Sequence, residues 1–481
     1  NGFNGKINMK RCDSVFTGLY KVKSGEKDVP VYFCRVSKIP FNTVWPGHQR
    51  PIDQTEEAGF ILLEAKDEVT LEITPSLSFK EALFRPLSKN ITPEISGKTI
   101  KATFPIGHYS LECDDFHNAL HIFIVPEKDY SKYKNAKNLL YYGEGEHRVG
   151  TTELKSDTVV YVDKGARLYG NFIARNAENI AFVGHGIIDG SWEERTAKTE
   201  SAPDDEGNFA IGAMRIYESK NILIDGITFM DSACWTHTFY HCENIEINDI
   251  RHIGMWRYNA DGIDIINCKN VHIKNSFFRN FDDIIVPNGR KDWEDEVTEN
   301  LLVENSVMWC DWGRTLELGA ITQASEIRNI HYKNLDLIHN MHGAMSMQNR
   351  VFADAHHILY EDIRVEYDKN CLEPKYQSSD DAEYTGKAGY MPPLFHAWIY
   401  PLPRVEGTGR YGKNHDVTLK NINIFVDEGL GKPPVIISGK DEEHKTWNIF
   451  FEDIFINGEK VTELSGLDTQ IGPFAEKVYI K

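Results

Sequence analysis

The most regular feature of the sequence is a short motif in which apolar and polar positions alternate. Each copy starts with Asn, Asp or His, continues as apolar, any, apolar, any, and often ends in Asn, Asp or Gly. Alternation with a period of two, filled by β-branched and aromatic residues, predicts a half-buried strand and not a helix. The copies begin at Asn179, Asn221, Asn244, Asn270, Asn300, Asn329, His357, Asp416 and Asn448.

The spacing of these copies indicates a solenoid. Most successive starts lie 23 to 32 residues apart, which leaves room for two more short strands and their turns in each coil. We therefore predict an all-β chain whose main part is a right-handed parallel β-helix. A leucine-rich horseshoe is the competing architecture, but its LxxLxL-N signature is missing. The recurring Asn side chains are expected to stack through amide hydrogen bonds from coil to coil.

Two regions depart from the repeat. Upstream of residue 139, short alternating runs such as 69–73 and 117–125 predict an antiparallel β-sandwich. We place an N-terminal domain at 1–138 and the β-helix domain at 139–481. The wide gap after His357 predicts a long loop insertion at about 371–413, rich in Tyr, Pro, Trp and His, and such a loop is usually functional in a compact solenoid.

Charge and composition narrow the partners. The 481 residues include 53 basic and 72 acidic side chains, so the net charge of -19 repels phosphate backbones and anionic membranes. We predict neither nucleic acid nor a membrane as partner, and no apolar stretch is long enough to span a bilayer. The eight cysteines are far apart and indicate buried thiols, with no metal site or cofactor. The sequence shows no signal-peptide pattern, so such a segment has been removed or never existed. We favour a secreted or periplasmic location, with a cytoplasmic one as the alternative, and the oligomeric state stays open.

Two acidic segments one coil apart are the candidate chemistry. Asp261 lies in NADGID, and Asp282 and Asp283 lie in FDDI. Because neighbouring strands are roughly 5 Å apart, the three carboxyls are expected to cluster. Glycosidic hydrolysis needs such a set, with one protonated carboxyl for the leaving oxygen and one ionised carboxylate for water, and mutual repulsion raises one pKa. The alternative is a structural role, since Asp-Gly and Asp-Asp pairs are common in turns.

From residue 141 onward the sequence resembles glycoside hydrolase family 28, the polygalacturonase family, and its β-helical relatives, the dextranases and isopullulanase. The resemblance is carried by residues 141–170, by GHGIIDGSW (184–192), by NADGIDI (259–265) and by the Asp282-Asp283 pair. It implies that Asp282 is the general acid and that Asp261 and Asp283 hold and deprotonate the attacking water. Inversion of the anomeric centre would follow.

Two departures from the family pattern bear on the substrate. Gly313-Arg314-Thr315 stands where the family has Gly-His-Gly, and HGAMSMQ (342–348) places Met345 and Met347 at the two basic positions of Arg-Ile-Lys. Methionine cannot pair with a uronate, so we expect a neutral or sparsely charged poly- or oligosaccharide. The alternatives are a polygalacturonase-like hydrolase of pectic uronates with other basic residues, a polysaccharide lyase, and a non-catalytic carbohydrate-binding β-helix.

Several polar and aromatic residues near the same coils are candidates for substrate binding, because sugars dock through ring faces and hydroxyl hydrogen bonds. One further candidate stands in the N-terminal WPGHQR segment. The set is Asn259, Trp312, Arg314, Glu317, His342, Gln348, Arg350 and His48.

Overall fold

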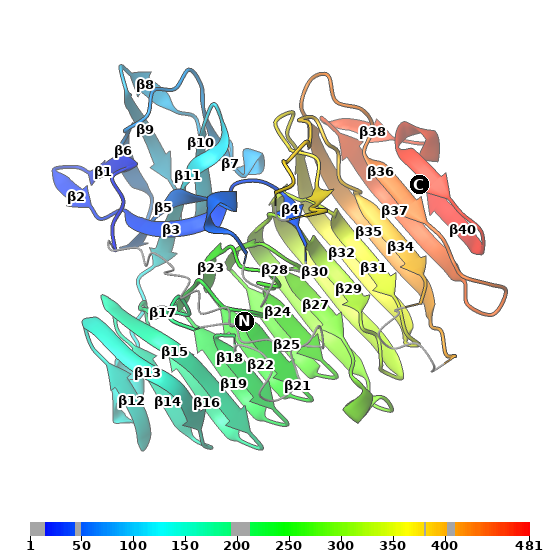
Figure 1. The fold of residues 1–481 in the computed structure, drawn as a ribbon, viewed down its shortest axis with the longest axis horizontal. Helices are drawn as coiled ribbons and strands as arrows, with labels where there is room; N and C mark the ends of the chain where they lie inside the picture. Colours follow the sequence, from blue (N-terminus) through cyan, green and yellow to red (C-terminus); the bar gives the residue numbers. More distant parts are fainter. Residues whose placement is uncertain (1–14, 44–49, 194–211, 380, 402–408) are drawn as a thin grey trace.

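The computed structural model describes residues 15–43, 50–193, 212–379, 381–401 and 409–481, and these residues build an all-β molecule (Figure 1). Within them the helical elements are short 3-10 turns, and no helix is long and apolar enough to cross a membrane. The turns are η2 (Ile52–Gln54), η3 (Leu87–Lys89), η4 (Ser131–Asn135), η5 (Lys291–Trp293) and η7 (Leu464–Gly466). The predicted fold class, a parallel β-helix preceded by antiparallel sheets, is confirmed.

The N-terminal part consists of two five-stranded sheets with an apolar core between them. The first sheet contains, in spatial order, β2 (Lys27–Val29), β1 (Tyr20–Ser24), β6 (Val69–Pro75), β9 (Thr99–Phe104) and β8 (Glu94–Ser96). The second contains β3 (Tyr32–Ser37), β5 (Thr55–Ala65), β11 (Asp115–Pro126), β10 (Gly107–Cys113) and β7 (Ala82–Arg85). All pairs are antiparallel except β5 with β11. The division into domains at residue 138 stays a prediction.

The remaining chain winds into one continuous sheet of 28 strands in which strands pair in parallel from coil to coil. One face contains β12 (Asn138–Tyr142), β14 (Thr158–Val162), β16 (Glu178–Val183), β19 (Lys220–Asp225), β22 (Glu243–Asn248), β25 (Lys269–Lys274), β28 (Thr298–Cys310), β30 (Glu326–His339), β32 (Asp354–Tyr367), β35 (Lys413–Val426), β37 (Thr446–Ile456) and β40 (Ala475–Ile480). β38 (Glu459–Val461) closes a hairpin with β37.

Two further faces complete each coil. The face beneath the N-terminal sheets contains β17 (Ile187–Asp189), β20 (Thr228–Met230), β23 (Arg251–Met255), β26 (Phe277–Asn280) and the second half of β28. The third contains β18 (Met214–Tyr217), β21 (His237–Tyr240), β24 (Ile263–Ile266), β27 (Ile285–Asn288), β29 (Arg314–Ala320), β31 (Gly343–Asn349), β34 (Phe395–Ile399), β36 (Pro434–Ile437) and β39 (Asp468–Ile471). β13 (Gly145–Leu154) and β15 (Ala166–Arg175) run across both.

The predicted stack of asparagines is confirmed at the start of the motif strands. Asn221 Nδ2 donates to Asn179 Oδ1 over 3.0 Å, and the same bond continues through Asn244, Asn270, Asn300 and, at 3.3 Å, Asn329. These residues have a positive φ, which Asn tolerates better than most side chains. The ladder therefore fixes the turn of each coil while the alternating apolar side chains fill the interior.

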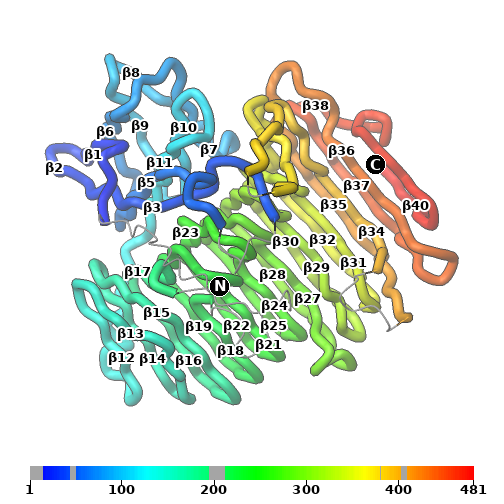
Figure 2. Tube along the Cα trace, in the orientation of Figure 1, coloured from blue at the N-terminus to red at the C-terminus, as the bar shows by residue number. Residues whose placement is uncertain are grey.

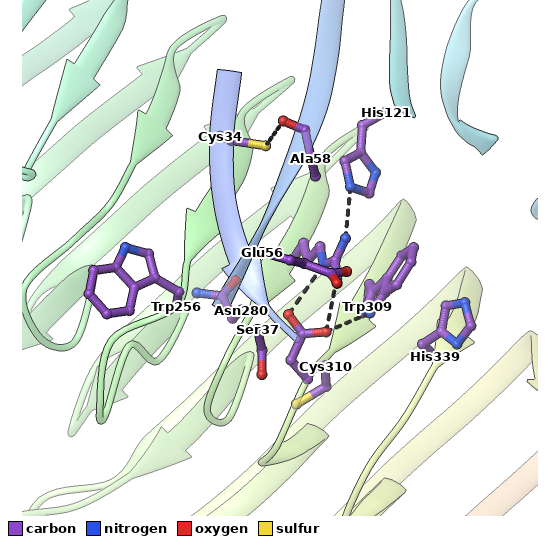
Figure 3. Close-up of polar contacts among 12 residues, drawn as sticks. Cys34, Ser37, Glu56, Ala58, His121, Trp256, Asn280, Trp309, Cys310 and His339 are labelled. Carbon is purple, nitrogen blue, oxygen red and sulfur yellow. Dashed lines mark hydrogen bonds and ion pairs between the residues drawn. The ribbon is translucent and has the colours of Figure 1, made fainter. Parts of the chain in front are cut away.

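The second N-terminal sheet packs directly on the β-helix. Phe60 and Phe123 share a buried apolar cluster with Ile253 and Phe277 of the coils. Beside it lies a buried polar network, in which Arg279 Nη1 is 3.1 Å from His121 Nε2 and Arg279 Nε donates to Asp311 over 3.2 Å. Figure 3 shows this network, with His121 of the sheet above it and Trp309 of the β-helix donating to the same carboxylate.

The insertion at 371–413 meets the N-terminal segment. β33 (Lys375–Tyr376) pairs with β4 (Phe41–Asn42), and Figure 2 shows the blue and yellow segments side by side over the middle coils. The insertion is not one continuous loop, because β34 within it is a regular strand of the third face.

Candidate active site

The three predicted acids lie in two turns that enter neighbouring strands of the third face. Asp261 precedes β24, and Asp282 and Asp283 precede β27. Ile263 is in register with Ile285, so Asp261 lies one coil away from Asp283. Gly262 N donates to the carbonyl of Asp283 over 2.8 Å, which ties the two turns together. The structure thus brings the three acids together.

Close backbone packing explains the glycines around these acids. A Cβ on Gly262 would lie 2.3 Å from the carbonyl oxygen of Ile284, and one on Gly313 would lie 2.6 Å from Asp282 Oδ1. Neither position has space for a side chain. Asp282 and Asp283 lie between β26 and β27, outside a regular strand, so strict alternation does not force them to opposite faces.

Hydrogen bonds hold the Asp pair in place. Asn259 Nδ2 donates to Asp282 Oδ2 over 3.4 Å, and the backbone N–H of Asp283 donates to Asp282 Oδ1 over 3.2 Å. Asp283 Oδ1 accepts a 2.7 Å bond from the backbone N–H of Arg314. The predicted residues Asn259 and Arg314 therefore both contact the acid pair.

Burial dominates the electrostatics of the cluster. It raises the pKa of Asp261 well above the usual range, and the charges of Asp282, Asp264 and Asp283 raise it further. The pKa of Asp283 is also raised by burial, although Arg314 opposes the shift. A set of interacting carboxyls of this kind keeps a proton at a pH where exposed carboxyls have lost theirs.

Asp264 is a fourth acid that was not among the predicted site residues. It is fully buried in β24, and neither carboxylate oxygen has a hydrogen-bond partner among the described residues. Burial raises its pKa well above the usual range, while Arg290 opposes the shift. The sequence signal was present, because Ile263 and Ile265 are core residues and alternation turns Asp264 away from the core.

Arg314 and Glu317 extend the site along β29. Arg314 Nε lies 3.7 Å from Glu317 Oε2, and the pKa of Arg314 is raised because Glu317 and Asp283 together outweigh the effect of burial. Burial raises the pKa of Glu317 to about 8 against the opposing charge of Arg314. The neighbouring side chains of Ser346 and Gln348 act to lower this pKa, so these neutral groups face the same space, and neither carboxylate oxygen of Glu317 has a hydrogen-bond partner among the described residues.

The assignment of Met345 and Met347 to substrate-facing positions was wrong. Both methionines are fully buried in the central apolar core of the β-helix. Because side chains alternate along β31, the outward positions are Ser346 and Gln348, which pair in register with His396 and Trp398. The two outward side chains of β31 are therefore uncharged, as expected, but they belong to Ser346 and Gln348 and not to the methionines.

The outward side chains of β34 form an aromatic row that was predicted only as part of the insertion. The rings of His396 and Trp398 stack with centroids 3.4 Å apart, and Tyr400 follows at 5.3 Å. Tyr400 donates to Gln348 Oε1 over 2.8 Å, and the Arg350 guanidinium lies 4.1 Å from the ring centroid of Tyr400. Gln348 and Arg350 thus adjoin this row.

The predicted residues Trp312 and His342 form a wall beside the acids. Trp312 is buried, stacks on Phe281 and meets Tyr376 edge to face at 5.2 Å. Burial lowers the pKa of His342 to about 4, so its imidazole is neutral near pH 7, and its Nδ1 contacts the carbonyl of Trp312. His48, the remaining predicted residue, lies outside the described residues.

In the described residues, one group of side chains that could hold a metal ion lies away from the acid cluster. Glu112, His339 and Asp368 converge at the contact between the N-terminal sheets and the β-helix. Arg85 already supplies a cation there, with Nε 2.8 Å from Glu112 and Nη2 3.0 Å from Asp368. The seven cysteines in the described ranges are free, and six of them are buried.

Comparison with known proteins concerns the family and the fold. The family model of glycosyl hydrolases family 28 matches residues 146–380. Similar curated proteins include the probable exopolygalacturonase B of Neosartorya fischeri, 23% identical over 294 residues that cover 54% of this chain and 61% of the relative. The exopolygalacturonase B of Aspergillus niger is 26% identical over 160 residues, 30% of this chain and 34% of the relative. The chain therefore spans less than two thirds of the length of these relatives.

Solved structures show the same fold. Dex49A from Penicillium minioluteum superposes with a TM-score of 0.60 at 15% identity, over 94% of this chain and 93% of its own. The hyperthermoactive exopolygalacturonase from Thermotoga maritima gives 0.51 at 17% identity, over 71% and 83%. At these identities the likeness concerns the fold.

Proposed function

We propose that this chain is a glycoside hydrolase of the polygalacturonase type, because residues 146–380 match the family model of glycosyl hydrolases family 28. The observation that carries the proposal is the convergence of Asp261, Asp282 and Asp283 on two neighbouring turns. A protein that merely bound glycans would gain nothing from three mutually repelling acids, two of them with raised pKa values.

The roles follow from the chemistry of a single displacement. Protonated Asp282 donates to the glycosidic oxygen as the bond to the anomeric carbon breaks. Asp261 and Asp283 hold a water on the opposite face of the sugar, and one of them takes its proton as the new bond forms. The product then has the inverted anomeric configuration. Asn259, which donates to Asp282, and Arg314, which donates to Asp283, position the two carboxyls.

The test of this mechanism is the configuration of the fresh product. Proton NMR of a digest, recorded before mutarotation, is expected to show the anomer opposite to that of the substrate. Retention would contradict the single displacement. An absorbance at about 235 nm that rises together with sugar release would instead indicate an unsaturated product and therefore elimination.

The sugar bound beside β31 is proposed to be neutral. Ser346 and Gln348 are the outward side chains there, and neither carries the positive charge that would form an ion pair with a uronate. A pectic uronate is the second candidate, favoured by the names of the curated relatives and by the two nearby guanidinium groups of Arg314 and Arg350.

The two candidates separate in one assay. Polygalacturonate and neutral α-glucans, β-glucans and galactans are compared at equal concentration, each at low and moderate salt. Cleavage of a neutral glycan supports the first candidate. Cleavage of polygalacturonate alone, lost in Arg314→Met and weakened by salt, supports the second.

A further inference from the structure

A cavity lies between the N-terminal sheets and the β-helix. It has a volume of about 540 Å³, within the range of small-ligand sites, and none of the acids of the candidate active site lines it. One wall comes from β10, the turn before it and the end of β11, including Ile106, His108 and Tyr109. The opposite wall comes from the turns of the coils, among them Asn275 and Asn305.

His108 lines this cavity and carries a buried polar atom without a hydrogen-bond partner. The residue is only 7% exposed, and its Nε2 has no hydrogen-bond partner among the described residues. The same atom is 3.9 Å from Asp249 Oδ1, too far for a hydrogen bond. Burial lowers the pKa of His108 to about 3, so the imidazole is neutral near pH 7. A buried polar atom of this kind is costly unless something binds it.

An interrupted asparagine ladder lines the opposite wall. Asn275 Nδ2 donates to Asn248 Oδ1 over 2.9 Å, and Asn334 Nδ2 donates to Asn305 Oδ1 over 2.6 Å. In the part of the chain that the structure describes, no hydrogen bond joins Asn275 to Asn305, although both lie in the cavity wall. A carbonyl oxygen and an amide N–H on adjacent coils are therefore open to a ligand.

The charges around the cavity are already paired. Lys128 Nζ contacts Asp225 over 2.6 Å and Asp249 over 2.9 Å, and Lys89 Nζ lies 3.6 Å from Asp336. Among the described residues that line the cavity, a carboxylate on the ligand would find both lysines already paired and would meet these acids. Apolar side chains between the polar groups, such as Ile106, fit the faces of a ring.

We propose that this cavity is a second binding site, which holds a short neutral saccharide between the two parts of the molecule. A hydroxyl group can donate to the Asn275 carbonyl and accept from the Asn305 amide, and another can bond to His108. This match requires a polyhydroxylated, uncharged ligand. The site is separate from the hydrolytic one, and its binding does not depend on the proposed cleavage.

The test uses the full chain carrying Asp282→Asn, so that no probe is hydrolysed. Binding of maltotriose, galactotriose and trigalacturonate is measured by calorimetry. At least one neutral trisaccharide is expected to bind, and His108→Leu and Asn305→Gly are each expected to weaken that binding on the order of tenfold. Leucine can pack on the Phe123 ring next to His108, and glycine tolerates the positive φ of Asn305.

Matched controls separate binding from stability. His185→Leu removes another buried imidazole, and Asn300→Gly removes an amide from the continuous ladder, both outside the cavity wall. The controls are expected to bind as the parent does. Binding of neither neutral probe, affinity unchanged by both cavity substitutions, or tighter binding of trigalacturonate would each overturn the proposal. If the unsubstituted chain cleaves no glycan while the cavity binds, the proposed function fails and this site stands.

Discussion

Two groups of buried carboxyls in this molecule have opposite electrostatics. At the contact of the N-terminal sheets with the β-helix, Glu112, Glu366 and Asp368 surround Arg85. Burial alone would raise the pKa of Glu112, but Arg85 and His339 outweigh it and lower the pKa to about 2. In the acid cluster before β24 and β27, burial prevails and the pKa of Asp261 is raised.

The difference lies in the partners. Arg85 supplies its guanidinium to three carboxyls, whereas the acids of the other group chiefly face one another. One arginine does not fully offset three acids, and burial still raises the pKa of Glu366 to about 7. We infer that the first group joins two parts of the chain, while the second is retained at a cost in stability because the chemistry needs it.

The largest expected effect is on catalysis. Asp282→Asn is expected to lower kcat on the order of 10³-fold, because an amide cannot protonate the leaving oxygen, and to leave the thermal midpoint near that of the parent. Hydrolysis rates and melting curves of the same preparation check this. Asp453→Asn, on the exposed surface, is the control. Turnover close to the parent's would remove Asp282 from the acid role.

The next effect is on stability. Arg85→Met is expected to lower the free energy of unfolding by about 3–5 kcal/mol, because it leaves buried carboxylates without their cation. Urea denaturation measures the loss. Lys445→Met removes two partly exposed ion pairs and should cost under about 1 kcal/mol. If both substitutions cost the same, the contact of the two parts does not depend on Arg85.

Local pattern allowed much of this molecule to be predicted. The alternating motifs predicted the strands, the recurring asparagines predicted the ladder, and the spacing of Asp261 and Asp282 predicted that they lie on neighbouring coils. The same alternation turns Met345 and Met347 inward, whereas the comparison with the family motif had placed them at the outward positions, one residue away from Ser346 and Gln348.

Long-range partners could not be predicted. Arg85 meets Glu366 across 281 positions of sequence, and no local pattern relates them. The aromatic row of β34 was anticipated only through composition, because the insertion gave no repeat by which to assign its inward and outward side chains. The same holds for the cavity at His108, whose two walls come from separate parts of the chain.

A smaller effect concerns pH. Arg314 opposes the raised pKa of Asp283, so Arg314→Met is expected to raise that pKa further. A base with a higher pKa stays protonated to a higher pH, and the acid limb of kcat/KM is then expected to move upward by about one unit. Arg314→Lys keeps a positive charge there, so its acid limb should stay close to that of the parent. The charge of Arg350 is not among those that act on Asp283, so Arg350→Met should leave the acid limb of kcat/KM in place.

The smallest effect tests the cost of the acid cluster directly. Asp264 has a raised pKa, so the native state favours its protonated form and loses stability as the pH rises above the unfolded value of about 4. Asp264→Asn should therefore stabilise the chain by about 1 kcal/mol at pH 7, and the gain should shrink toward pH 4, where the carboxyl is protonated.

Asp368→Asn is the matched opposite, because its carboxylate accepts a bond from Arg85 and its loss should destabilise. Denaturation of both variants at pH 4, 5.5 and 7 gives the slope of the free energy of unfolding against pH for each. Destabilisation by Asp264→Asn at every pH would mean that this acid, like Asp368, has a structural partner, and the contrast between the two groups would then be confined to Asp261, Asp282 and Asp283.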